Sequence, residues 1–140
     1  MNEMIALGRF LRSIDLSDGA VHERAQQVCA RILVRLAQEE KPLLTAYDLQ
    51  TEDVRPIRIR VRVNGEIDES LTRYAFAVFD SPETALAAHY SKLIAVPARA
   101  LLERILDGEA DQILLFTGAR KGWDVTIRGE TLCNVWKEEN

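Results

Sequence analysis

The residue types that most often do chemistry are few in this chain and lie far apart. Its histidines, His22 and His89, and its cysteines, Cys29 and Cys133, do not have metal-ligand spacing. No GxGxxG, GxxxxGK(S/T), GxSxG or HExxH motif occurs, so the sequence predicts no phosphate-binding loop, activated serine or zinc-peptidase helix. Carboxylates are abundant, but none forms a pair in a predicted apolar pocket, where the pKa of a general acid is raised. We therefore expect a protein that is not an enzyme and that holds no metal and no cofactor.

The best local candidate for a site is the loop at residues 117–123, in which two glycines flank a pair of cations and a tryptophan follows. Loops on rigid scaffolds often carry function, and tryptophan and arginine often anchor interfaces. We therefore predict a partner-binding surface made of this loop, the second tryptophan of the chain and the N-terminal helix. Its predicted residues are Arg120, Lys121, Trp123 and Trp136. The alternative is a hairpin turn with solvated cations and a core Trp123, with Trp136 as a packing residue.

A second candidate is a strand at residues 57–63, where isoleucine and valine alternate with arginine. This period of two predicts one apolar face and one arginine face, carrying Arg58, Arg60 and Arg62. The arginines could form an anion-binding or nucleic-acid-binding stripe. They could instead form a solvated face that pairs with carboxylates across the sheet. The acidic residues that follow the Asn64-Gly65 turn favour this second interpretation.

The elements that position these residues centre on residues 74–117. They are predicted as strand 74–79, helix 82–91, short strand 93–96, helix 98–107 and strand 112–116. Both faces of strand 74–79 are apolar, which indicates a central place in a sheet. Ser81 followed by Pro82 is typical of a helix start, and Gly108 of a helix end. A strand at 123–128 is expected to pair antiparallel with strand 112–116.

The remaining chain is predicted to be mostly helical. Helices are expected at 3–14, at 20–40 and at 130–138, with Ser17 or Asp18 as the cap of the second. Residues 43–47 could form a strand before an acidic loop at 48–55. We interpret both cysteines as small core residues. The expected fold is a single-domain α+β protein over residues 1–140, in which N-terminal helices pack on a mixed sheet of about five strands with two crossover helices. Residues 1–20 could be a separate helical extension.

Composition agrees with a globular protein and excludes several classes. The chain has 140 residues, of which 47% are hydrophobic and 29% charged. Its net charge of −4 argues against a protein whose main partner is nucleic acid. No apolar run is long enough to span a membrane, and the N-terminus lacks the features of a secretory signal. We therefore expect a cytoplasmic protein without a membrane partner.

Three short motifs in the second half of the chain resemble the SseB-like family, known for the enhanced serine sensitivity protein and its N-terminal domain. They are Val78-Phe79-Asp80-Ser81-Pro82-Glu83, Val96-Pro97-Ala98-Arg99-Ala100-Leu101-Leu102-Glu103 and Ala110-Asp111-Gln112-Ile113-Leu114-Leu115-Phe116-Thr117-Gly118. The resemblance covers residues 76–136. Thr117-Gly118 departs from it, because that family usually has an Asn-Pro-Gly-like turn there. The resemblance implies an α/β domain of a bacterial cytosolic protein and supplies no catalytic residues.

The sequence and this resemblance together point to interaction or regulation. We expect a small bacterial protein that works by binding another protein, and a homodimer stays open. One alternative is a chaperone-like or immunity-like protein that masks a secreted effector or toxin. Another is a small-ligand-binding protein or enzyme with a cleft near the strand ends.

Overall fold

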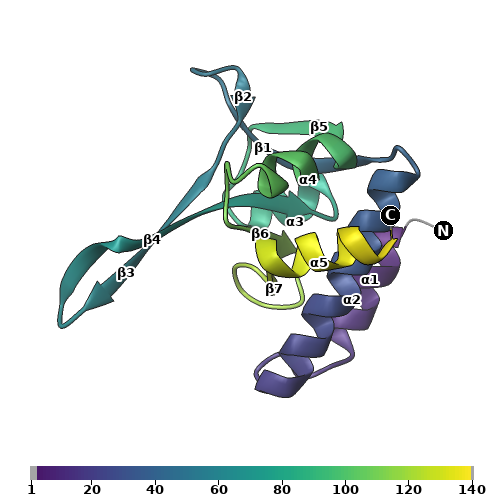
Figure 1. Cartoon of the computed structure of the whole chain (residues 1–140), viewed down its shortest axis with the longest axis horizontal. Helices are drawn as coiled ribbons and strands as arrows, with labels where there is room; N and C mark the ends of the chain where they lie inside the picture. The colour runs from purple at the N-terminus through teal and green to yellow at the C-terminus, as the bar shows by residue number, and fades with distance from the viewer. Residues whose placement is uncertain (1–2, 140) are drawn as a thin grey trace.

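The computed structural model describes residues 3–139 and confirms the predicted single-domain α+β fold (Figure 1). Within these residues, two helices come before the first strand, and the other three helices lie between or after the strands of the sheet. The elements are α1 (Glu3–Arg12), α2 (Gly19–Gln38), β1 (Pro42–Asp48), β2 (Asp53–Val54), β3 (Ile57–Val63), β4 (Glu66–Phe79), α3 (Pro82–Ala87), β5 (Leu93–Pro97), α4 (Ala98–Leu106), β6 (Gln112–Phe116), β7 (Val125–Arg128) and α5 (Gly129–Glu139).

The sheet is mixed and built around the parallel pair β4 and β6. Its strand order is β2-β1-β4-β6-β7, with β3 paired to β4 and β5 paired to β1. Residues 75–79 of β4 pair with residues 112–116 of β6, and all other pairs are antiparallel. The connection between β4 and β6 passes through α3, β5 and α4, which confirms the predicted crossover helices. Residues 75–79 are buried, as predicted for a central strand.

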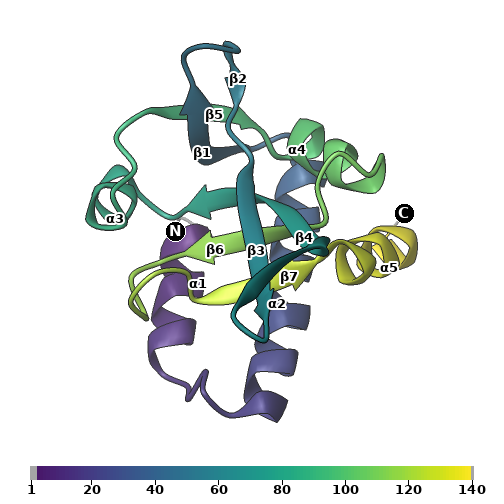
Figure 2. The same cartoon turned by 90° about the vertical axis from the view of Figure 1, so that its left-hand side faces the viewer.

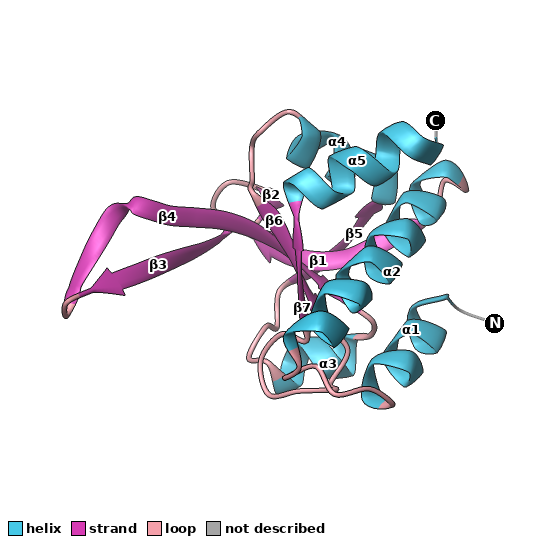
Figure 3. Cartoon of the chain, turned by 60° about the horizontal axis from the view of Figure 1, so that its bottom comes forward, coloured by secondary structure: helices cyan, strands magenta, loops and turns pink. Residues whose placement is uncertain are grey.

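The two faces of β4 and β6 contribute to different core clusters because side chains alternate along a strand. Phe76 and Val78 belong to the larger cluster, which is covered by α1, α2, α4 and α5. Figure 3 shows α2 and α5 on this side of the sheet. Ala77 and Phe79 belong to the smaller cluster, which Ala85 of α3 helps to cover. In α1, the side chains of Met4, Leu7 and Leu11 are buried within the larger cluster.

The long α2 helix begins where its predicted cap lies. The Asp18 side chain accepts hydrogen bonds from the backbone N–H groups of Ala20 and Val21, and this satisfies donors that have no partner within the first helical turn. Cys29 is fully buried on this helix and Cys133 is partly buried on α5; both are free thiols. Within residues 3–139, no helix is long and apolar enough to cross a membrane.

Several predicted elements are longer than those observed. The helix predicted at 82–91 ends at Ala87, and His89 then has a φ of 67°, a left-handed conformation that stops the helix. The strand predicted at 123–128 begins at Val125. Trp123 precedes the strand and is 44% exposed, so the interpretation of Trp123 as a core residue is wrong. The segment 48–55, predicted as a loop, contains the short strand β2, which pairs with β1.

The hairpin of β3 and β4 projects from the body of the protein as an arm, residues 57–74 (Figure 1). Asn64 and Gly65, with φ angles of 53° and 83°, form the predicted turn at its tip. Ile57 and Ile59 pack on the smaller core cluster at its base. Beyond them the expectation of a packed apolar face is wrong, because the exposed fractions are 38% for Val61 and 45% for Val63.

We predict that Gly129→Ala destabilises the fold. The backbone N–H of Gly129 donates to the carbonyl oxygen of Asp111 at 2.7 Å, and a Cβ at residue 129 would lie 2.8 Å from that oxygen. Moving the backbone to relieve this contact should lower the free energy of unfolding by about 1–3 kcal/mol, measured by urea denaturation. Gly19→Ala is the matched control, because no atom lies within 4 Å of a Cβ there. Equal stability of the two variants would contradict the prediction.

Candidate functional site

One buried carboxylate holds the loop between β6 and β7. Asp124 is fully buried, and its Oδ2 accepts hydrogen bonds from the backbone N–H of Thr117 at 2.6 Å and from the Thr117 hydroxyl. Its Oδ1 accepts a hydrogen bond from the backbone N–H of Arg120 at 2.8 Å. Gly118 and Gly122 have φ angles of 80° and 82°, in the left-handed region that favours glycine. The turn geometry therefore explains the two glycines, and Asp124 fixes the loop on its inner side.

Helix α1 adds a cation to this loop. Arg12 donates a hydrogen bond from Nη2 to the carbonyl oxygen of Thr117 at 2.5 Å, although the two residues are 105 positions apart. Gly8 lies one turn earlier in α1. A Cβ at residue 8 would lie 3.4 Å from Oδ2 of Asp80 and 3.4 Å from Cβ of Thr117. Glycine at this position therefore lets α1 approach the ends of β4 and β6 closely.

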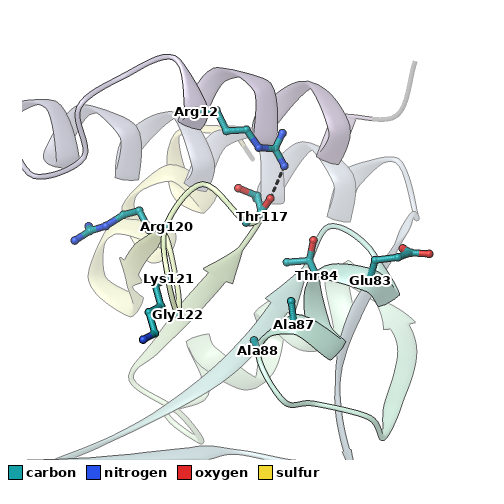
Figure 4. Close-up of a pocket in the computed structure, with 10 residues that line it drawn as sticks. Arg12, Glu83, Thr84, Ala87, Ala88, Thr117, Arg120, Lys121 and Gly122 are labelled. Carbon is teal, nitrogen blue, oxygen red and sulfur yellow. Dashed lines mark hydrogen bonds between the residues drawn. The ribbon is translucent and has the colours of Figure 1, made fainter.

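A hollow of about 400 Å³ lies between this loop and α3 (Figure 4). We call it the cationic hollow. It lies at the carboxyl ends of the parallel strands β4 and β6, the place where open α/β sheets usually bind ligands. Figure 4 shows Arg12 directed at Thr117, and Arg120 directed away from α3. The charged and hydroxyl-bearing residues that line the cationic hollow are Arg12, Glu83, Thr84, Thr117, Arg120 and Lys121.

An adjoining hollow of about 340 Å³ has aromatic walls, and we call it the aromatic hollow. The rings of Tyr90 and Phe116, whose centroids are 6.0 Å apart, contribute to it together with Trp123. The two hollows share Lys121 and three small residues, Ala87, Ala88 and Gly122. His89 also lines the aromatic hollow, and its left-handed conformation costs a non-glycine residue about 1–2 kcal/mol.

Three of the four predicted site residues lie together on the loop, and the fourth lies elsewhere. Lys121 and Trp123 line the hollows, and Arg120 lines the cationic hollow and also lies beside the turn between α1 and α2. The pKa of Asp15 in that turn is lowered, first by hydrogen bonds from Ser17 and then by the positive charge of Arg120. Trp136 is on α5, where it packs on the larger core cluster with the Arg99 guanidinium 5.7 Å from its ring centroid. Figure 2 shows α5 at the opposite end of the strands from the loop.

Sequence reasoning did not find Arg12, Thr84 or Tyr90 as lining residues of these hollows. Arg12 gave no usable indication, because in the sequence it is one exposed cation of an amphipathic helix. Thr84 and Tyr90 follow a predicted helix start, and a site at that point could have been inferred from the rule that ligands bind at the carboxyl ends of parallel strands.

The hollows offer recognition by charge, hydroxyl and aromatic groups. Within residues 3–139, no group of three or more His, Cys, Asp and Glu side chains is placed to hold a metal ion. Burial raises the pKa of the Cys29 thiol to about 12, and the negative charge of Asp124 adds to this rise. Cys29 therefore stays protonated at neutral pH and supplies no thiolate.

The arm offers a second candidate surface, and its register determines which side chains meet. The pairing of β3 with β4 shifts between Ile59 and Val61. Directly opposite residues of an antiparallel pair share one face of the sheet. Beyond the shift, the opposed pairs are Val61 with Asp68, Arg62 with Ile67 and Val63 with Glu66. The carboxylates at 66 and 68 therefore lie on the valine face and not on the arginine face.

Among the described residues, one arginine of β3 pairs with a carboxylate. Arg58 contacts Glu69 at 3.3 Å, and both side chains are largely exposed. Arg62 donates a hydrogen bond to the carbonyl oxygen of Gly65 at 3.1 Å, and the Arg60 side chain has no hydrogen bond or ion pair within residues 3–139. The expectation that cross-strand carboxylates neutralise the arginine face therefore holds for Arg58 and is wrong for Arg60 and Arg62.

Comparison with known proteins gave no match: no family model fits the sequence, and no curated protein or solved structure is significantly similar to it. The SseB-like resemblance, the absence of catalysis and the protein partner therefore stay predictions.

We predict that Asp124→Asn loosens the β6–β7 loop. An amide has one acceptor oxygen, so its nitrogen would face either the N–H of Thr117 or that of Arg120, and one buried donor would lose its partner. The free energy of unfolding should fall by about 1–3 kcal/mol, and amide hydrogen exchange at residues 117–120 should accelerate.

Asp18→Asn is the matched control for this change. Asn caps helices as well as Asp does, and the Asp18 side chain accepts its two hydrogen bonds through one oxygen. Unchanged hydrogen exchange in the loop of Asp124→Asn would contradict the role given to Asp124.

Proposed function

We propose that this protein is a non-catalytic protein-binding module whose arm adds a strand from its partner. The observation that carries the proposal is that one edge of β3 is unpaired. Within the described residues this strand pairs with β4 alone, so the N–H and C=O groups of its outer edge face solvent. A free edge of this kind is a template for another chain.

The exposed side chains of the arm support the same function. Val61 and Val63 lie near the tip with no core to cover them. Burying such apolar surface gains about 25 cal/mol per Å², so a strand laid along β3 would gain both backbone hydrogen bonds and apolar contact. Residues 60–72 include no buried side chain. The outer part of the arm therefore contributes little to the stability of the core. We expect this of an element whose role is to contact a partner.

Trimming the arm should abolish partner capture and leave the fold intact. Ile59 and Arg73 are opposed across the hairpin, so residues 60–72 can be replaced by an Asn-Gly turn between them. We expect the trimmed protein to unfold within about 1 kcal/mol of the full chain. Affinity capture from the native lysate with quantitative mass spectrometry should recover a protein with the full chain that the trimmed chain loses.

The double variant Arg120→Ala with Trp123→Ala serves as the comparison, because it alters the loop and keeps the arm. If it loses the partner while the trimmed chain retains it, the binding surface is the loop and the arm assignment is wrong. Equal capture of the partner by the full chain, the trimmed chain and the double variant would show that neither the arm nor the loop binds it.

The adjoining hollows support a second candidate function, the binding of a small ligand. Their volumes of about 400 and 340 Å³ fall in the range of ligand sites. Lys121 lines both, with aromatic walls on one side and the Arg12 guanidinium and Thr84 hydroxyl on the other. This arrangement suits an aromatic ring that carries an anionic group.

A titration monitored by Trp123 fluorescence tests this second function. The chain has two tryptophans, so in a Trp136→Phe background Trp123 alone reports. Adenosine monophosphate should change the emission saturably and bind more tightly than adenosine or inorganic phosphate. Lys121→Gln should weaken it roughly tenfold, since it removes a charged hydrogen-bond donor, whereas Lys137→Gln on α5 should not. No saturable change with any of the three compounds would contradict the assignment.

A further inference from the structure

We infer that the strand added to β3 comes from a different protein and alternates carboxylate with apolar residues. This inference rests on the proposed function and concerns the chemistry of the partner. It follows from the side chains that β3 presents on its two faces. Arg58, Arg60 and Arg62 lie on one face, and Ile59, Val61 and Val63 lie on the other.

A second copy of this chain does not fit the edge of β3. In an antiparallel pair of two β3 strands centred on residue 60, Arg60 would face Arg60, and Arg58 would face Arg62. Like charges directly opposite one another destabilise a pair of strands. A shift of this pairing by one residue would place each arginine opposite a valine or isoleucine. Neither the charged nor the apolar side chains would then face side chains of a matching type. The edge is therefore protected against self-pairing in both registers.

Two arginines of β3 lack a carboxylate partner within residues 3–139, and a bound strand could supply one to each. The Arg60 side chain has no hydrogen bond or ion pair among the described residues, and the Arg62 side chain bonds only a backbone oxygen there. On β4, the register places Glu66 and Asp68 on the valine face, and Glu69 pairs with Arg58, so no β4 carboxylate pairs with Arg60 or Arg62. A strand on the free side of β3 would bring its own side chains opposite these arginines. Glutamate or aspartate at every second position would then pair with them.

The other positions of the partner strand would face the exposed valines. Val61 and Val63 have Asp68 and Glu66 beside them on β4 and no neighbour on the outer side of β3. Apolar residues of the partner would cover these side chains. The partner segment is therefore extended, with carboxylates facing the arginines and valine-like residues facing the valines.

Nucleic acid fits the arm less well than an acidic strand does. The chain has a net charge of −4, and the arm itself carries three carboxylates, Glu66, Asp68 and Glu69. A chain of net negative charge is a poor partner for a polymer that carries a phosphate at every residue. A nucleic acid would also leave the backbone edge of β3 unpaired, whereas a strand would satisfy it.

Fluorescence anisotropy with labelled peptides as long as β3 tests the inference. One peptide alternates valine with glutamate, a second alternates valine with lysine, and a third has the composition of the first with its glutamates in one block. We expect the valine–glutamate peptide to bind, and the other two to bind at least roughly tenfold more weakly. A single-stranded oligonucleotide of similar charge is the polyanion probe and should also bind more weakly.

Charge reversal on β3 gives the decisive comparison. Arg60→Glu with Arg62→Glu should lose the valine–glutamate peptide and gain the valine–lysine peptide. Arg31→Glu with Arg35→Glu makes the same change in net charge on the exposed side of α2 and should bind as the unaltered chain does. This control separates contact at β3 from the overall charge of the protein.

Each contrary result would contradict a different part of the inference. If all three peptides bind β3 equally, strand addition stands and the acidic partner is wrong. If the oligonucleotide binds most tightly and the reversal abolishes that binding, the arginines recognise phosphate and the inference is overturned. If no peptide binds while lysate capture still depends on the arm, the partner is not an extended acidic strand. If neither depends on the arm, the proposed function fails as well.

Discussion

The parallel pairing of β4 with β6 is the interaction on which the rest of the structure depends. Residues 75–79 of β4 and 112–116 of β6 are almost entirely buried, and each strand contributes to both core clusters. A parallel pair needs a long connection between its strands, and here that connection supplies α3, β5 and α4. Because both faces are covered, the pair fixes where these strands end and therefore where the loops after them begin.

Both candidate surfaces are extensions of β4, at its opposite ends. At its carboxyl end, β4 is followed by α3, which forms one wall of the cationic hollow beside the loop after β6. At its amino end, residues 66–74 leave the core and pair with β3 alone to form the arm. The two surfaces are thus separated by the buried part of one strand. A protein segment on the arm and a small molecule in the hollows would not compete for the same contacts.

Much of the fold was predictable from local pattern, and the errors have a common cause. The alternation at 57–63, the apolar run at 112–116 and the cap at Asp18 each found the right element. The pattern at 57–63 also predicted a packed face, which is wrong for Val61 and Val63. Alternation shows that a strand has an apolar face, but it does not show whether anything covers that face. The same limit applies to Trp123: the alternative interpretation as a core residue is wrong, because the strand begins two residues later and Trp123 is exposed.

The sequence by itself determined the type of nearly every element, the turn at Asn64-Gly65 and the concentration of cations between Gly118 and Gly122, because these depend on side-chain periodicity and on backbone preferences of nearby residues. The tertiary structure alone decided that Arg12 bonds Thr117, that Trp136 lies apart from the loop, and that Asp68 and Glu66 face valines and not arginines. These facts depend on strand register and on contacts between residues far apart in the chain. On the arm, for example, the shift in pairing between Ile59 and Val61 decides which side chains face one another without changing the type of any element.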